Sequence, residues 1–177
     1  MKYPILLSFA CGFLLTLSAC SSVSVDDYSK NSPKLAPQEF FNGNLMAKGV
    51  VKNRSGKVTR YFTATIDAHW KDGVGTLDEK FIFDDGEIQY RTWTLKPNGQ
   101  NSFSGTAGDV IGVGDGKFSG NAINFKYVLA VKLKDSTVNL NVDDWMWLAD
   151  SNTVINESIL TKFGFKVGSI QLAMVKN

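Results

Sequence analysis

The chain has 177 residues, a formal net charge of only +2 and no basic tract, so its charge gives no support to a nucleic-acid-binding role. The length fits one domain with a sizeable core, because a domain of about 150 residues buries roughly 70% of its unfolded surface. Twelve Phe, five Tyr and four Trp residues supply aromatic surface that must be buried or contact a ligand.

The first nineteen residues have the pattern of a bacterial signal peptide. Lys2 supplies a positive charge, and the apolar run at 5–17 is shorter than the about 20 residues of a membrane-spanning helix. The letters LSAC at 17–20 resemble a lipobox, in which small residues admit the peptidase and the cysteine thiol receives diacylglycerol. We therefore predict a lipoprotein signal peptide at 1–19 and lipidation, including palmitate, at Cys20. An ordinary secretory signal with a chance cysteine is the alternative.

The residue after the cysteine bears on the destination of the protein. An Asp at that position favours retention in the inner membrane, whereas this chain has Ser21, so we predict a lipid anchor in the outer membrane and a domain facing the periplasm. Cys11 would leave with the signal peptide. The mature chain would then have no free thiol, which excludes disulfides, cysteine nucleophiles and cysteine-ligated zinc.

Residues 20–38 are polar and rich in Ser, Asp and Pro, and we predict that they form a flexible tether behind the lipidated cysteine. A single β-barrel domain is predicted over residues 39–177. At its start, Phe40 and Phe41 are expected in a short turn that closes one end of the core.

From Asn44 onward, apolar and polar residues alternate with the period of two that is typical of half-buried strands. Turn sequences separate the alternating runs at 72–75, 84–86, 96–101 and 135–136. The predicted apolar faces comprise Phe62, Ala64, Ile66 and Ala68; Leu77, Phe81 and Phe83; Ile123, Phe125, Tyr127, Leu129, Val131 and Leu133; and Val138, Leu140, Val142, Met146 and Leu148.

Eight to ten such strands, with no long helical pattern between them, predict an all-β antiparallel meander. A meander of this length is stabilised by closing on itself, because closure removes its open edges. We therefore predict a single up-and-down β-barrel, whose lumen is filled by side chains or holds one small ligand. A two-sheet β-sandwich is the alternative. A membrane-spanning barrel is disfavoured, because its apolar face would have to point outward.

The segment 104–122 contains six glycines, yet it lacks the Gly-Lys-Ser/Thr ending and the following helix of a phosphate-binding loop. We interpret these glycines as kinks, bulges or a rim loop in the sheet.

The sequence offers few catalytic groups, and we assign no catalytic residue. His69 is the only histidine, and we interpret it as a surface residue because it falls on the polar face of its strand. Without a second histidine or a mature cysteine, the common zinc sites and Ser-His-Asp triads are disfavoured, so no metal and no cofactor is predicted. Glu79, Asp144 and Glu157 are the carboxylates considered for a lipid- or glycan-acting enzyme.

Several polar side chains fall in phase with the apolar faces, and they are the candidate ligand-binding residues: Glu79, Arg91, Trp93, Tyr127 and Asp144. Burying such groups unpaired is costly, so they must pair with each other or with a ligand. One interpretation is an internal ion pair between Arg91 and a carboxylate that fixes strand register. The other is an amphiphile pocket, in which aromatic rings hold a tail and Arg91 and Tyr127 hold an anionic head.

The segments EFFNG, TLDEKFIFDDGEIQYRTWTL, GTAGDVIG, DDWMWLAD and NESILTKFGFKVGSI together resemble a bacterial lipoprotein family known as domain of unknown function 3833, from about Phe40 to Val175. The resemblance implies an envelope lipoprotein of Gram-negative bacteria that faces the periplasm and has a lipocalin-like barrel. It implies no established activity and no catalytic residues.

These observations favour a binding protein: an outer-membrane lipoprotein whose barrel holds a fatty-acid-like or other hydrophobic molecule without turnover. A structural or assembly partner in the envelope, with an exposed aromatic patch around Trp145 and Trp147, is the main alternative. An enzyme acting through carboxylates is the third. The expected partners are the membrane, through the lipid anchor, a hydrophobic or amphiphilic small molecule, and an envelope protein, but no nucleic acid.

Overall fold

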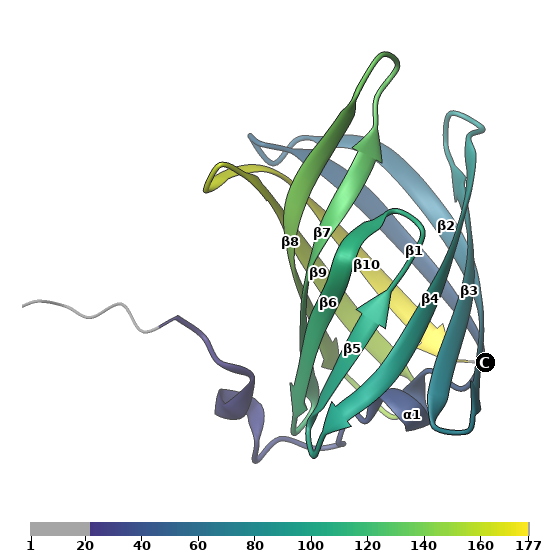
Figure 1. Ribbon diagram of the computed structural model, residues 1–177, viewed down its shortest axis with the longest axis vertical. Helices are drawn as coiled ribbons and strands as arrows, with labels where there is room; N and C mark the ends of the chain where they lie inside the picture. Colours follow the sequence, from purple (N-terminus) through teal and green to yellow (C-terminus); the bar gives the residue numbers. More distant parts are fainter. Residues whose placement is uncertain (1–21, 177) are drawn as a thin grey trace, which may run out of the picture.

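The chain folds into one closed antiparallel β-barrel, seen in a computed structural model that describes residues 22–176 (Figure 1). The signal peptide and Cys20 predicted from the sequence lie outside the described residues. The strands are β1 (Gly43–Asn53), β2 (Val58–Lys71), β3 (Val74–Phe83), β4 (Ile88–Gly99), β5 (Ser102–Thr106), β6 (Val110–Ser119), β7 (Ala122–Lys132), β8 (Thr137–Leu148), β9 (Thr153–Lys162) and β10 (Phe165–Lys176).

Each strand pairs with the next in chain order, and β10 returns to pair with β1 along most of its length, which closes the sheet. The predicted up-and-down barrel is therefore confirmed, and the two-sheet sandwich is excluded. No helix within residues 22–176 combines the length and the apolar character needed to cross a membrane.

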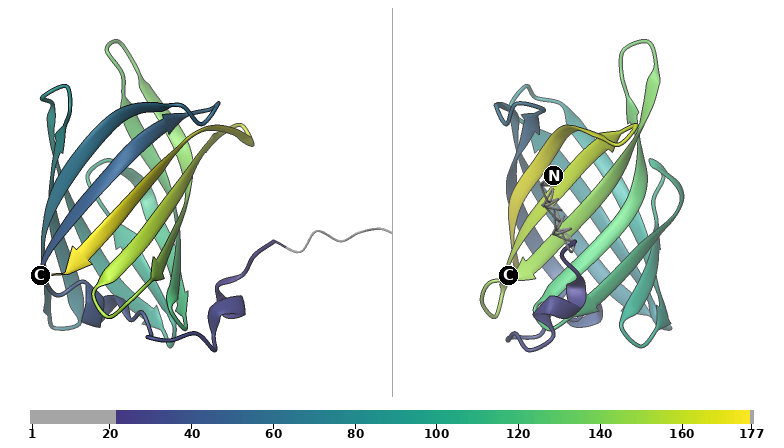
Figure 2. Two further views of the ribbon diagram at one scale, coloured as in Figure 1. Left: turned by 180° about the vertical axis from the view of Figure 1, so that it is seen from behind. Right: turned by 90° about the vertical axis from the view of Figure 1, so that its left-hand side faces the viewer.

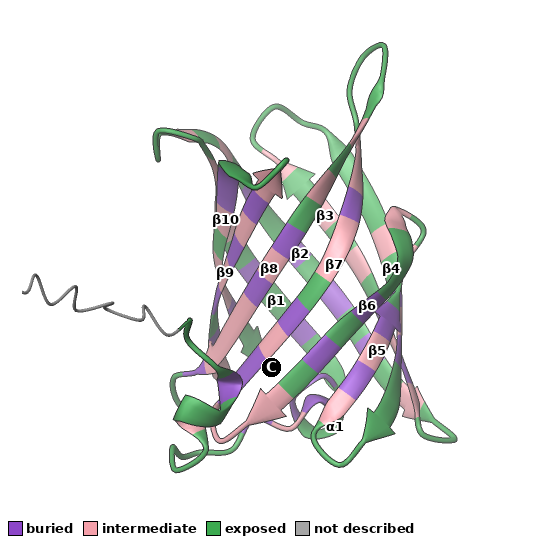
Figure 3. Cartoon of the chain, turned by 60° about the vertical axis from the view of Figure 1, so that its left-hand side comes forward, coloured by how far each residue is buried: buried purple, intermediate pink, exposed green. Residues whose placement is uncertain are grey.

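Burial alternates along the strands as the sequence pattern predicts (Figure 3). In β2, the four side chains Phe62, Ala64, Ile66 and Ala68 are buried, while the residues between them are exposed. His69 is exposed on the outer face, as predicted. Because side chains in a strand point alternately to opposite faces, the apolar set lies inside the barrel.

One end of the barrel is closed by the short helix α1 (Pro37–Phe40), which lies across it below the strand ends (Figure 1). Phe40 and Phe41 are 5% and 4% exposed, and their rings meet edge to face. The indole N–H of Trp70 donates a hydrogen bond of 2.7 Å to the Phe41 carbonyl oxygen. The predicted plug of this end by the two phenylalanines is confirmed.

Between β4 and β7, the wall of the barrel is formed by the short strand β5 and by β6. The short strand β5 pairs with β4 only from Thr94 to Gly99, and the chain then turns back into β6. Beyond that turn, a hollow of about 460 Å³ lies between β4 and β7, bordered by Arg91, Asp109 and Lys132 among others. The barrel therefore has a lateral hollow above the β5–β6 hairpin.

The glycines of β5 and β6 make room for aromatic rings. A Cβ atom at Gly105 or Gly114 would lie 2.6 Å from the Phe125 ring, and one at Gly116 would collide with Phe103. The register also shifts between Ile111 and Asp115, which marks a bulge. The glycine-rich segment is therefore an irregular part of the sheet, as predicted, rather than a phosphate loop.

Residues 24–35 form a strap that packs on the outside of the barrel. Within it, the 3₁₀ helix η1 (Val25–Tyr28) begins with a capping box between Ser24 and Asp27. Leu35 is 1% exposed, and its backbone N–H donates 2.8 Å to the carbonyl oxygen of Gly120. Residues 24–35, which lie within the segment predicted as a flexible tether (20–38), are therefore in contact with the barrel through local capping and a buried leucine.

The strap also covers part of the aromatic pair Trp145 and Trp147. Their rings stack at 5.8 Å, and the Tyr28 ring lies 5.9 Å and 6.4 Å from them. Figure 2 shows the strap alongside the barrel wall near the closed end. The aromatic patch expected to be exposed is therefore partly used by the chain itself.

Substitution of Gly120 is expected to detach the strap. Gly120 has φ +54°, and a Cβ there would collide with the Tyr28 carbonyl oxygen. Gly120→Ala should lower the free energy of unfolding by roughly 1–2 kcal/mol, the strain of a left-handed non-glycine residue, and more if the strap shifts. Urea titration measures the stability, and limited proteolysis measures cleavage within 24–35. Gly108→Ala, with open space around its Cβ, is the control. Unchanged proteolysis in Gly120→Ala would contradict the role of this contact.

Candidate ligand-binding site in the barrel lumen

A cavity of about 330 Å³ occupies the lumen and lies within the size range of small-molecule sites. Most of its lining is apolar, and the larger apolar side chains include Phe62, Phe81, Phe83, Trp93, Phe103, Phe125, Leu129, Leu140, Leu160, Ile170 and Leu172. The five candidate residues from the sequence all line it: Glu79, Arg91, Trp93, Tyr127 and Asp144. Strand phase alone was enough to place them on the inside.

The polar groups form a layer, which we call the polar belt: Glu79, Arg91, Asp144, Asn156 and Ser158 line the cavity, and Asp109 joins them through Arg91 from the hollow between β4 and β7. Below it, toward α1, lies the main apolar core around Trp93 and Phe125. Above it, a smaller apolar cluster of Leu129, Val142 and Leu160 lines one wall. The belt is therefore a polar layer between two apolar ones.

Arg91 is the cation of the polar belt and is held by two carboxylates. Its Nε donates to both carboxylate oxygens of Asp109 at 3.0 Å, and its Nη2 donates to Oδ2 at 2.7 Å. Glu79 faces Arg91 directly in the β3–β4 register, with Nη1 3.8 Å from Glu79 Oε2. The internal ion pair considered in the sequence interpretation is present, with Asp109 as its main partner. A bidentate pair of this kind holds the guanidinium firmly.

Glu79 has acceptor capacity that the protein leaves unused. Its Oε2 atom is buried without a hydrogen-bond partner, and its side chain is only 12% exposed. Burial raises the pKa of Glu79 to about 7, although the charge of Arg91 acts in the opposite direction. An unsatisfied buried acceptor is costly, so a donor brought to this carboxyl group would stabilise it.

Asp144 is the second carboxyl group of the lumen. Its Oδ1 accepts hydrogen bonds from Asn156 Nδ2 at 2.5 Å and Ser158 Oγ at 2.7 Å. Burial raises the pKa of Asp144 to about 6, and these two hydrogen bonds oppose the rise. Its neighbour Asp143 points to the outer face, where it accepts from Asn124 at 2.6 Å. Only one of two adjacent aspartates therefore contributes to the lumen.

Tyr127 and Trp93 join the polar belt to the apolar core. Their rings meet edge to face at 5.1 Å, and Trp93 packs in the same way on Phe125. Burial raises the pKa of the Tyr127 phenol well above its ordinary value, with the charge of Asp144 adding to the effect. The phenol is therefore neutral and can serve as a hydrogen-bond donor.

The upper lumen has an aromatic wall opposite the Leu129 cluster. Phe62, Phe81 and Phe83 have ring centroids 5.6–6.5 Å apart. Arg60 lies over the Phe83 ring at 3.7 Å and pairs with two exposed carboxylates, Asp85 at 2.8 Å and Glu87 at 2.7 Å. This guanidinium is thus also neutralised by the protein.

Three residues of the polar belt escaped the sequence interpretation. Asn156 and Ser158 lie on the same face of β9 as the buried Val154 and Leu160, at a spacing of two residues, so strand phase could have identified them. Asp109 lies in the turn between β5 and β6, where no periodic signal exists. Asp109 can reach Arg91 because the strand register brings this turn beside β4 and β7. There the Asp109 carbonyl oxygen accepts a hydrogen bond of 2.8 Å from the Ala130 N–H.

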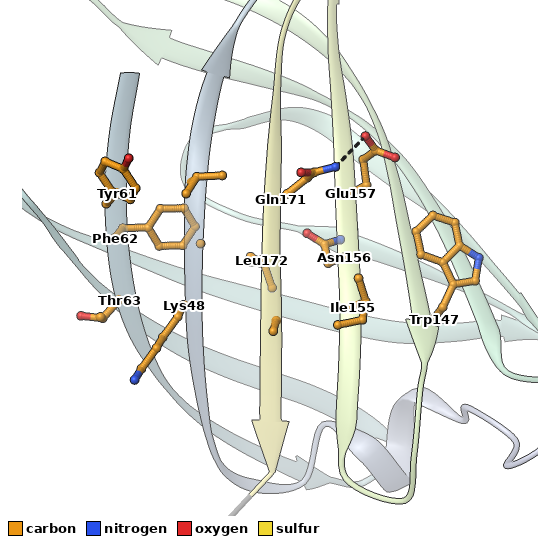
Figure 4. Close-up of a pocket in the computed structure, with 13 residues that line it drawn as sticks. Lys48, Tyr61, Phe62, Thr63, Trp147, Ile155, Asn156, Glu157, Gln171 and Leu172 are labelled. Carbon is orange, nitrogen blue, oxygen red and sulfur yellow. Dashed lines mark hydrogen bonds between the residues drawn. The ribbon is translucent and has the colours of Figure 1, made fainter. Parts of the chain in front are cut away.

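A larger hollow of about 650 Å³ lies on the outer face of the barrel over β2, β1, β10, β9 and β8 (Figure 4). It is shallow, and Lys48, Tyr61 and Gln171 at its surface are exposed. Glu157, one of the carboxylates considered for catalysis, lies here and accepts 3.2 Å from Gln171. It points away from the lumen carboxyl groups, so it does not form a pair with them.

Within residues 22–176, no three His, Cys, Asp or Glu side chains are grouped as metal ligands would be. The polar belt supplies paired charges, two buried carboxyl groups and a phenol around an apolar cavity. Such an arrangement can orient the polar end of a mainly apolar molecule.

Comparisons with known proteins support the same fold. A family model described as "Protein of unknown function (DUF3833)" matches residues 14–176. A search of curated proteins finds no match. Among solved structures, the chain is similar to the S-type phycobiliprotein lyase CPES from Guillardia theta, with a TM-score of 0.58. That alignment covers 81% of this chain and 93% of the lyase at 12% identity, so it shows a shared lipocalin-like barrel fold only.

The raised pKa values predict a pH-dependent stability. Glu79 and Asp144 have folded pKa values of about 7 and about 6, above their ordinary values of 4.5 and 3.8. The folded state therefore binds more protons than the unfolded state. The stability that this contributes is fully present below the unfolded pKa values, and it is lost as pH rises through the folded pKa values. Between about pH 5 and about pH 8, the free energy of unfolding should fall by on the order of 3 kcal/mol.

Urea denaturation across this pH range measures the effect. Glu79→Gln should flatten the decline, because the titrating group is removed with little change in shape. Glu157→Gln on the outer face should retain the wild-type slope. An identical pH dependence for Glu79→Gln and the wild type would show that Glu79 does not titrate in this range.

Proposed function

We propose a function for this chain, which belongs to the DUF3833 family of proteins of unknown function, from the geometry of its barrel. The barrel binds one hydrophobic or amphiphilic small molecule in its lumen, without turnover. The observation that carries the proposal is the cavity of about 330 Å³, which has apolar walls above a polar belt. A barrel that served only as a scaffold would gain stability by filling such a space with side chains.

The shape of the barrel supports this proposal. One end is closed by α1 and its phenylalanines (Figure 1). The cavity extends toward the other end, where Val51, Phe83 and Leu140 line it and are only half-buried. Similarity to a structure named a phycobiliprotein lyase is compatible with a barrel that handles a hydrophobic molecule. The proposal rests on the cavity and not on that name.

The cellular part of the proposal follows from the sequence. Residues 1–19 would be removed as a signal peptide, and Cys20 would carry the lipid that anchors the domain in the outer membrane, facing the periplasm. The strap contacts the barrel near its closed end, at Tyr28 and Leu35. An anchor just before the strap would hold the domain near its closed end. The opposite end, toward which the cavity extends, would then point away from the anchor.

An envelope protein partner stays a prediction. The aromatic pair Trp145 and Trp147, which suggested it, is partly covered by Tyr28. We therefore favour the ligand-binding function over an assembly role.

Narrowing the upper lumen should abolish ligand binding. Leu140 lines the cavity, whereas its neighbour Asn139 is exposed on the outer face, so Leu140→Trp and Asn139→Trp form a matched pair. The test protein comprises residues 20–177 with Cys20→Ala, which prevents acylation and retains every described residue. We expect Leu140→Trp to weaken binding of the neutral fluorophore N-phenyl-1-naphthylamine by about tenfold or more, as loss of an apolar pocket should.

Fluorescence titration measures the binding, and thermal unfolding confirms that both variants fold. Solvent extraction of the protein followed by mass spectrometry should also recover a stoichiometric amphiphile. A wild-type barrel that binds no apolar probe and yields no extracted molecule would overturn the proposed function.

Lipidation has its own test. Cells expressing the full chain should incorporate labelled palmitate into it, and Cys20→Ala should lose the label and leave the membrane fraction or remain unprocessed. Cys11→Ala, inside the apolar run, should keep both properties. Palmitate labelling that persists in Cys20→Ala would contradict the assigned anchor.

A further inference from the structure

We infer that the lumen selects an amphiphile whose polar end donates hydrogen bonds, an ammonium or a hydroxyl group, and discriminates against a carboxylate end. This inference rests on the proposed function and deepens it. It also departs from the anionic head that the sequence suggested for Arg91 and Tyr127.

The first argument is that Arg91 has no free charge to offer. Three hydrogen bonds join it to Asp109, and Glu79 lies 3.8 Å from its remaining nitrogen Nη1. A ligand carboxylate would have to compete with Glu79 for Nη1, the nitrogen that makes no hydrogen bond, or displace Asp109 from the other two. Displacing a partner of a part-buried ion pair is unfavourable, because the released charge stays in a poorly solvated site.

The charge of the second cation that lines the lumen is also paired. Arg60 donates through Nη2 to Asp85 and Glu87 and lies against the Phe83 ring, and its buried Nε has no hydrogen-bond partner. Arg60 and Arg91 are the only cations among the residues that line the cavity. Each guanidinium charge on the described wall is therefore matched by two carboxylates, and an entering anion would compete with them.

The third argument is the excess of acceptors. The two guanidinium groups face five carboxylates in all: Glu79, Asp109 and Asp144 in the polar belt, and Asp85 and Glu87 beside Arg60. The Glu79 Oε2 atom has no hydrogen-bond partner, and the two hydrogen bonds to Asp144 both go to Oδ1. These carboxyl groups can accept further hydrogen bonds, which only a donor can supply.

A donor end and a carboxylate end would therefore have opposite effects on the polar belt. An ammonium would neutralise the excess negative charge, and a hydroxyl would satisfy an acceptor and accept from the neutral Tyr127 phenol. A carboxylate would place another like charge beside Glu79 and Asp144, which destabilises both. The apolar walls above the belt contact the alkyl part in each case, so the discrimination comes from the polar end alone.

A matched series of twelve-carbon probes tests the inference: dodecylammonium, dodecanol and dodecanoate, each competing with N-phenyl-1-naphthylamine for the acyl-free protein at about pH 8, where Glu79 and Asp144 are mostly ionised. We expect dodecylammonium and dodecanol to displace the fluorophore at concentrations at least about tenfold lower than dodecanoate. The comparison uses the wild-type lumen, so it does not depend on any variant folding. The two donor arms distinguish an amine ligand from an alcohol.

Two variants then identify the carboxyl groups responsible. Glu79→Gln and Asp144→Asn remove one negative charge each and should narrow the difference between dodecylammonium and dodecanoate by at least about threefold. Their controls are Glu157→Gln and Asp143→Asn on the outer face, which remove the same charge and should keep the wild-type ratio.

The outcomes separate the two proposals. If the fluorophore binds and dodecanoate competes as well as dodecylammonium, the inference is overturned and the binding function stands. If the outer-face controls change the ratio as much as the lumen variants, the inference is also overturned, because the preference would come from overall charge. If neither the fluorophore nor any alkyl probe binds, the proposed function itself fails.

Discussion

The pairing of β10 with β1 is the constraint on which the rest of the structure depends. A closed sheet has an inside, so every second residue of each strand must share a confined volume. Glu79, Arg91 and Asp144 are in phase with apolar neighbours and are therefore buried with them. Closure thus converts an alternating sequence into a lumen that contains charge, and that charge must be compensated within the barrel.

The compensation is uneven, and this unevenness gives the lumen its chemical character. Asp109 accepts the three hydrogen bonds that the Arg91 side chain donates. Within the described residues, no cation lies as close to Glu79 or Asp144, and burial raises the pKa of both carboxyl groups. The belt is hence rich in acceptors and poor in free cations. A purely structural ion pair would need only one carboxylate, so the additional ones are the feature that points to an external hydrogen-bond donor.

Strand phase predicted most of the fold and five lumen residues from the sequence, because period two depends only on local backbone geometry. It did not reveal Asp109, which lies in a turn and reaches Arg91 only through the strand register. The contacts of the strap were not predicted from the sequence for a different reason. Its polar composition resembles a linker, whereas Leu35 and the capping box at Ser24 hold it in place through contacts with a distant turn at Gly120.

The Arg91–Asp109 pair has a consequence for how the two sides of the barrel wall are related. Arg91 lines both the lumen cavity and the hollow of about 460 Å³ between β4 and β7, and Asp109 borders that hollow. An occupant that disturbed this pair from inside would therefore also alter the outer surface between β4 and β7. The filling of the lumen could thus be sensed from outside the barrel.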